Sequence, residues 1–537
     1  MPEPSQSTQK LIQRYQSWFN DSQRKEGVPT IHVDEVASAV AAFYEKIRGV
    51  VDWREEHLMR RGAIGRMLKR RLVLTKDSKA IAEPLIFELI RGGHFPSDRI
   101  EESKIAVVQK SLEKYFYISE NRPTNISERK KIQTYSWLID VAACEIEEIL
   151  SSSQRERALI EYMSDSMQMR IKINQGTQLT IKVSEEEKNT QIYIAVQRAL
   201  FKLDSATICY HLLKRRYPEW FNLSLNQLQE ITNKIYTISD DLEKELNHRL
   251  GDKFYKICER YDTPYLLLGD ILSQKISPLE IEKKITEPEA MEKLIKEAYA
   301  KRYATLKKRL HRAAFYSTLS MFSTNVFSII ILEWPVAKYL LKMYMGPITI
   351  AVDILGPTFL MFILVLTISL PPKSNLDAVI IETMKIAYKR EKVGIYEIKA
   401  PKKRGLITKT LIALIYILGA IFSFGIVILI FMAAGFPPTS IFINLMFVAL
   451  IAFAGSAVRE RSKELTVEEK PSNVLEFLFD ILFLPIVSTG RWLSNKWKQY
   501  NAVAAFFNAL IDMPFSMFTE FLEQWRNFLK EKKEEIH

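Results

Sequence analysis

The chain has 537 residues, a formal net charge of +12 and three cysteines, with 47% hydrophobic and 26% charged residues. The cysteines are in no paired spacing, which argues against a disulfide framework or a zinc site. The average composition is that of a soluble protein, but residues 1–312 are charge-rich and residues 313–456 contain long runs almost without charge. The excess of basic residues is suited to binding a nucleic acid or an anionic membrane surface and does not distinguish between them.

The first 312 residues predict a mainly helical domain. In VDEVASAVAAFYEKIRGVV, apolar residues such as Val36 and Val40 recur every three or four positions, which is typical of an amphipathic helix. Ser184, three residues ahead of a glutamate, predicts a capped helix start, with the helix reaching toward Arg216. Ser239, directly before two aspartates, predicts another helix start.

Residues 168–184, QMRIKINQGTQLTIKVS, alternate apolar and polar side chains around a central Gln-Gly pair. The alternation predicts a two-stranded β-hairpin. Because such a hairpin is marginal alone, we expect it to pack on helices, with pairing to another chain as the lesser alternative. It divides the region into two helical subdomains, 1–167 and 168–312.

Two basic segments stand out in this region. RRGAIGRMLKRRL, residues 60–72, predicts an amphipathic helix whose outer face carries Arg66, Lys69 and Arg70. That face is either solvated or in contact with anionic lipid, and nucleic acid is less favoured because no aromatic residues interleave. The second segment, residues 300–312, leads into an apolar run and carries Lys307, Lys308, Arg309 and Arg312.

Four segments are long and apolar enough to cross a membrane, since about 20 apolar residues span its core. They are residues 313–332, 349–370, 407–434 and 439–457. The first contains several polar residues, and its alternative is a buried helix of the soluble domain. The sequence therefore predicts a four-helix transmembrane region over residues 313–457.

Because one side of these segments holds only Lys338 and Lys342, most of the basic residues that flank them lie on the opposite side. They occupy residues 301–312, the loop 371–406 with Lys402, Lys403 and Arg404, and the stretch after residue 457. By the positive-inside rule, the N-terminal domain, this loop and both termini are expected in the cytoplasm, with the basic residues among anionic headgroups.

Polar residues inside the predicted spans are candidates for a functional site. Asp353 is followed by Gly356-Pro357, an arrangement that exposes ion sites in the broken helices of transporters, and Asn444 lies in the fourth span. The alternatives are a simple proline kink and an interfacial acid satisfied by Lys338, Lys342 or water.

The tail, residues 458–537, predicts two or three amphipathic helices on the inner leaflet or under the spans. Glu476, Asp480 and Pro485 divide its first apolar stretch into pieces too short to cross a membrane. A hairpin dipping into the membrane around Pro485 is the alternative.

The sequence contains no phosphate-binding, zinc-protease, CxxC or nucleophile-elbow motif. Asp240 and Asp241 resemble an aspartate-rich magnesium motif only superficially, because they follow a serine as capping residues do and the second motif is missing. No metal, cofactor or catalytic residue is therefore predicted.

Three segments, VDEVASAVAAFYEKIRGVVDWREEHLMRR near the start and FDILFLPIVSTGRWLSNKW and FLEQWRNFLKEKKEE near the end, resemble uncharacterised multi-pass membrane proteins of candidate-phylum bacteria. The resemblance covers both ends of the chain and implies a bacterial inner-membrane location. It implies no activity, so no functional residue carries over.

The sequence thus predicts a mainly α protein with a helical cytoplasmic domain, one small hairpin, four spans and an amphipathic tail. A large cytoplasmic domain without catalytic motifs favours a membrane scaffold or assembly factor, with a protein partner or a second copy bound. The alternatives are a small-solute transporter or channel using Asp353 and Asn444, and a membrane enzyme of lipid or envelope metabolism.

Overall fold

The computed structural model is mainly helical with one two-stranded sheet, which confirms the predicted class. It describes residues 4–21, 27–33, 56–75, 77–151, 153–174, 183–274, 278–340, 346–366, 370–388, 395–399, 406–433, 435–436, 438–467, 474–500, 521, 525 and 528–529.

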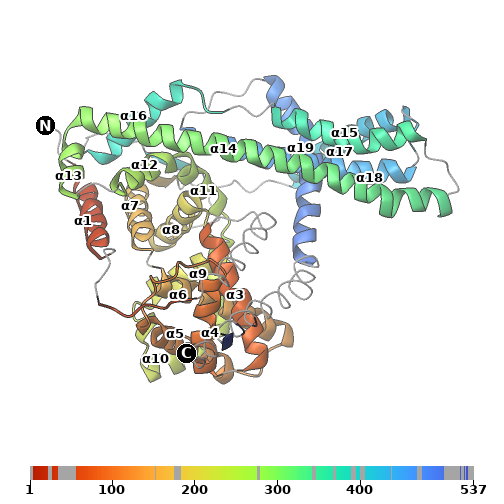
Figure 1. Ribbon diagram of the computed structural model, residues 1–537. Helices are drawn as coiled ribbons and strands as arrows, with labels where there is room; N and C mark the ends of the chain where they lie inside the picture. Colours follow the sequence, from red (N-terminus) through yellow and green to blue (C-terminus); the bar gives the residue numbers. More distant parts are fainter. Residues whose placement is uncertain are drawn as a thin grey trace.

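The N-terminal helices pack together, and the long helix α14 (Pro288–Ser328) lies along their edge (Figure 1). One cluster of buried side chains joins them, from Leu11 in α1 to Leu310 in α14. These helices are α1 (Gln6–Asp21), α3 (Glu56–Leu74), α4 (Ser78–Arg91), α5 (Ser103–Asn121), α6 (Glu128–Leu150), α7 (Gln154–Arg170), α8 (Glu185–Phe201), α9 (Ser205–Arg216), the 3₁₀ turn η1 (Trp220–Asn222), α10 (Leu225–Leu246), α11 (Gly251–Arg260), α12 (Asp262–Leu272) and α13 (Pro278–Thr286).

Side-chain caps set several helix starts in this domain. Ser184 caps α8 as predicted, but the helix does not continue to the end of α9, because Lys202 adopts a left-handed conformation and Asp204 caps a new start. The predicted start at Ser239 is wrong. Ser239 lies inside α10, whose capping box is formed by Ser224 further upstream.

The small sheet joins distant parts of the chain. β1 (Ile171–Asn174) pairs in parallel with β2 (Tyr396–Lys399), with Ile171 opposite Tyr396. β1 is the first half of the predicted hairpin. Its second half, residues 175–182, lies outside the described residues, so the hairpin stays a prediction.

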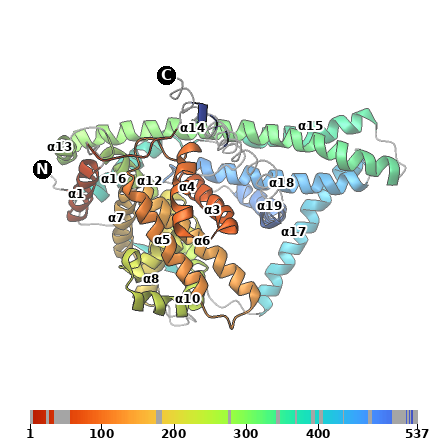
Figure 2. The same ribbon diagram turned by 60° about the horizontal axis from the view of Figure 1, so that its bottom comes forward.

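Beyond the N-terminal domain, the far half of α14 lies beside α15 (Pro347–Leu366) and α18 (Pro438–Ser462) (Figures 1 and 2). Between α14 and α15 the chain forms two π-helical turns, η2 (Ile329–Glu333) and η3 (Val336–Leu340). α17 (Leu406–Ala433) joins α18 at one end and diverges from the group in Figure 2.

Three of the described helices are long and apolar enough to cross a membrane: α14 over Pro288–Ile331, α17 over Thr410–Ala433 and α18 over Ser440–Ser462. α15 contains a shorter apolar stretch, Asp353–Val365. The apolar part of α17, the 24 residues Thr410–Ala433, extends about 36 Å at 1.5 Å per residue, which exceeds a hydrocarbon core of about 30 Å. Many of its large apolar side chains are exposed, as lipid contact requires.

The segments between and after the apolar helices fold back onto the N-terminal domain. Arg170 in α7 pairs with Glu382 of α16 (Ser374–Ala387) at 3.0 Å, which fixes the loop between α15 and α17. Asn375 of α16 donates to the Leu465 carbonyl at 2.6 Å and accepts from the Val467 N–H at 2.9 Å. The stretch after α18 is therefore held at the same end of the molecule.

The start of the tail differs from the prediction. α19 (Val474–Tyr500) is one continuous helix through Pro485, although a proline inside a helix removes a backbone hydrogen bond and crowds the preceding turn. α19 crosses α18 at Gly490, where an added Cβ would collide with the Ala449 carbonyl oxygen. Packing against α17 and α18 supports the helix where local sequence predicts a break.

Candidate functional site

One turn of α18 gathers the polar groups of the apolar helices. The Asn444 amide nitrogen donates to Asp353 Oδ1 at 2.6 Å and to the Ser440 carbonyl at 3.0 Å. Asn444 and Asp353 are 1% and 3% exposed. The structure therefore brings together the two polar residues that the sequence singled out in separate spans.

A second acid, Glu333, joins this turn. Ser440 Oγ donates to Glu333 Oε2 at 3.0 Å, and Ser328 Oγ donates to Glu333 Oε1 at 3.2 Å. Because Ser440 and Asn444 lie one helical turn apart on α18, they bring Glu333 and Asp353 to the same turn of that helix. Glu333 is 3% exposed, so two acids from different helices are buried together.

The π-helical turn η2 explains how Glu333 reaches the site. In α14, Asn325, Ser328 and Ile329 are buried at helical spacing, so a regular helix would next turn residue 332 inward. A π turn holds one extra residue, which moves Glu333 into that inward position instead. The sequence analysis did not single out Glu333, although it is the first charge after the apolar run.

Two oxygen atoms at the site have no hydrogen-bond partner among the described residues: Asp353 Oδ2 and Asn325 Oδ1. The Asn325 amide nitrogen donates to the carbonyl of Ile354, the residue after Asp353, at 3.4 Å. Buried carboxylates without a cation are costly, and inside membranes they mark ion and proton pathways.

The interfacial interpretation of Asp353 finds no support from Lys338. Its Nζ lies over the rings of Trp334 and Tyr339, 4.5 and 5.4 Å from their centres. Lys342 lies outside the described residues.

α15 continues through Gly356-Pro357, so of the two interpretations the described residues fit a proline inside a helix and not a broken helix. Pro357 lacks the N–H that would donate to the Asp353 carbonyl, and the Thr358 hydroxyl donates to the neighbouring Ile354 carbonyl at 2.8 Å. Over the described residues, the site therefore consists of side chains from α15, α18 and the π turn η2, and α15 is not unwound beside it.

The predicted lipid-contacting residues fall into three groups. On α3, Lys69 pairs with Asp140 at 3.4 Å and Arg70 pairs with Glu88, so these side chains are engaged inside the domain, and Arg66 also has a partner. On α14, exposed cations precede the apolar half: Lys307, Lys308, Arg309 and Arg312. Lys402, Lys403 and Arg404 lie outside the described residues.

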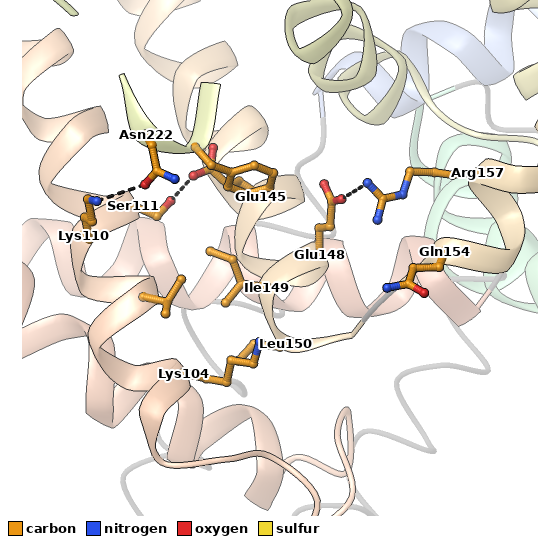
Figure 3. A pocket seen from close by; sticks show the side chains of 12 residues that line it. Lys104, Lys110, Ser111, Glu145, Glu148, Ile149, Leu150, Gln154, Arg157 and Asn222 are labelled. Carbon is orange, nitrogen blue, oxygen red and sulfur yellow. Dashed lines mark hydrogen bonds and ion pairs between the residues drawn. The ribbon is translucent and has the colours of Figure 1, made fainter. Parts of the chain in front are cut away.

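The N-terminal domain contains a cavity of about 510 Å³ between α5, the α6–α7 turn and η1 (Figure 3). On its wall, Glu145 accepts from Ser111, Lys114, Tyr115 and Trp220 at 2.7–2.8 Å. Glu148 is bound by Arg157, Lys214 and Tyr210. Burial would raise the pKa of Glu148, but Arg157 and Lys214 hold it below its ordinary value. Both acids are engaged in structural bonds, so neither is a ready acid or base.

The other candidate chemistry is dispersed. Asp240 pairs with Lys130, and Asp241 pairs with Lys244 at 3.1 Å, so the magnesium motif does not form a free carboxylate cluster. Over the part of the chain that the structure describes, no group of three or more His, Cys, Asp or Glu side chains could hold a metal ion.

Comparison with protein-family models, with curated proteins and with solved structures gives no match. The class of the molecule therefore rests on its own features: a mainly helical protein with three helices that could span a membrane and a buried acid pair between apolar helices.

Proposed function

We propose that this chain is a multi-pass inner-membrane protein that moves a small solute or ion by means of Glu333, Asp353 and Asn444. The buried acid pair is the observation that carries the proposal. Among the described residues no cation pairs with either acid, and acids buried in this way between membrane helices mark ion and proton pathways more often than simple helix joints.

Four crossings give the simplest topology. α14, α15, α17 and α18 each extend about 30 Å or more, and the α15–α17 loop and the stretch after α18 both contact the N-terminal domain. Because all three parts lie together, an even number of crossings separates them. The exposed cations on α14 favour the cytoplasm for this side, among anionic headgroups.

The test is ion flux in liposomes that contain the full-length protein. A potassium diffusion potential drives protons inward, and a trapped pH-sensitive dye reports acidification. We expect acidification with the natural protein and its loss with Asp353→Asn, which keeps the shape but removes the charge. Ser423→Ala, at a buried α17 residue bonded to its own helix at Gly419, is the matched control and should retain flux. Equal flux in Asp353→Asn and the natural protein would contradict the proposal.

A scaffold or assembly factor is the second candidate. It is favoured by the uninterrupted α14, which ties the N-terminal domain rigidly to the apolar helices. A scaffold should tolerate Asp353→Asn and should carry a stoichiometric foreign protein when extracted in mild detergent. Native mass spectrometry of the extracted complex measures this directly.

A further inference from the structure

We propose that Glu333 and Asp353 share a single proton, and that the ion handled at this site is a proton rather than a metal cation. The transport part rests on the function proposed above. The sharing of the proton rests on the hydrogen bonds and the burial of the two carboxyl groups.

The bonding of the four carboxyl oxygens requires such a proton. Glu333 Oε1 and Oε2 accept from Ser328 and Ser440, and Asp353 Oδ1 accepts from Asn444. Asp353 Oδ2 is buried and receives no donor from the described residues, and Ser440 and Asn444 hold the two acids at one turn of α18. Two ionised carboxylates can only accept, so a proton on one of them supplies the missing donor.

The orientation of Asn444 argues against a metal cation. Its amide nitrogen faces two acceptors, the Ser440 carbonyl and Asp353 Oδ1, so it presents hydrogens to the acid and not its oxygen. The serine hydroxyls also direct hydrogens toward Glu333. A sodium ion needs oxygen lone pairs directed at it, whereas these groups are arranged to stabilise a negative charge.

The proton belongs to the pair and not to either acid. With one proton, the pair carries one negative charge, spread over hydrogen bonds from Ser328, Ser440 and Asn444. Uptake of a second proton neutralises the pair, and its release restores the single charge. The site can therefore alternate between two states that differ by one proton, as proton coupling requires.

Dicyclohexylcarbodiimide tests the proposal because it reacts with protonated carboxyl groups in apolar surroundings. The acid protonates a carbodiimide nitrogen, the carboxylate oxygen adds to the central carbon, and rearrangement leaves a stable N-acylurea. The full-length protein in detergent is treated, digested and mapped by mass spectrometry. We expect labelling at Glu333 or Asp353 at neutral pH, with a rate that falls about tenfold per pH unit above the titration of the pair. The exposed Glu230 is the reference acid and should remain unlabelled.

Two variants show whether the acids act together. In Glu333→Gln, the new amide can donate to Asp353, so the proton is no longer required and labelling of Asp353 should fall at least tenfold. Asp353→Asn should protect Glu333 in the same way. Unchanged labelling of the remaining acid in both variants would overturn the shared proton, as would the absence of labelling in the natural protein. Gel filtration of each variant checks that it is folded.

Labelling in the presence of sodium, together with the flux assay, distinguishes the remaining outcomes. Protection from labelling by sodium chloride but not by choline chloride would show a sodium site and overturn the proton assignment. Labelling that needs both acids, without any flux, would support the shared proton while the transport function fails. Flux that needs Asp353, without labelling, would support transport and overturn the shared proton.

Discussion

Replacement of Lys114 by methionine should open the centre of the N-terminal domain. Lys114 Nζ contacts both Glu145 oxygens at 2.7 Å and the Trp220 carbonyl at 2.8 Å. The two charged side chains are only 8% and 1% exposed. Burial lowers the pKa of Lys114, and Glu145 opposes this by favouring the charged amine.

The loss of stability in Lys114→Met depends on the hydrogen bonds that Glu145 still accepts. Removing one partner of a buried ion pair costs about 3–5 kcal/mol. Ser111, Tyr115 and Trp220 still donate to Glu145, so we expect the lower end, about 3 kcal/mol. Since about 1.4 kcal/mol corresponds to a factor of ten, the open state should be populated about 100-fold more.

The assay uses Cys144, the residue next to Glu145. It is a free, buried thiol, so it reacts with a maleimide only when its surroundings open. Its labelling rate under native conditions is followed by mass spectrometry. If the domain opens and closes faster than the maleimide reacts, this rate should rise about 100-fold in Lys114→Met. Cys258, a buried thiol in α11, reports whether the opening is local or extends through the domain.

Two further variants make this prediction refutable. Lys234→Met removes the exposed partner of Glu230 and should leave Cys144 labelling unchanged. Replacing Lys114 by methionine and Glu145 by glutamine removes the uncompensated charge, while the glutamine oxygen can still accept from the buried donors, and should recover most of the protection. A change below threefold in Lys114→Met, or an equal effect of Lys234→Met, would refute the assignment of this pair as the centre of the domain.

Three other outcomes are expected. Gly490→Leu should separate α19 from α18, whereas Gly419→Leu, which meets open space, should not; cross-linking between the two helices measures this. Burial raises the pKa of Asp262 to about 8 despite the opposing Lys202 charge, so the folded state binds its proton more tightly and loses stability as pH rises from about 4 to 8. Asp262→Asn should flatten this slope in thermal unfolding across that pH range. Asn375→Ala should release the stretch at Leu465, at a cost of about 1–3 kcal/mol, and speed its hydrogen exchange.

Much of the fold could be predicted because its causes are local. Helical spacing of apolar residues, serine and aspartate caps and uncharged runs each act within a few residues of the chain. The candidate site was predictable in part for the same reason. An acid such as Asp353 or an amide such as Asn444 stands out in an apolar segment whatever surrounds it, because burying it there is costly.

The sequence by itself therefore determined a helical protein with apolar helices and two marked polar residues. Only the tertiary structure decided that Glu333 joins Asp353, through a π turn and a hydroxyl of α18 more than 100 residues away. It also decided that Pro485 lies within a helix and that β1 pairs with β2. Spacing along a chain sets which face of a helix a residue occupies, but contact between distant faces depends on how all the helices pack together.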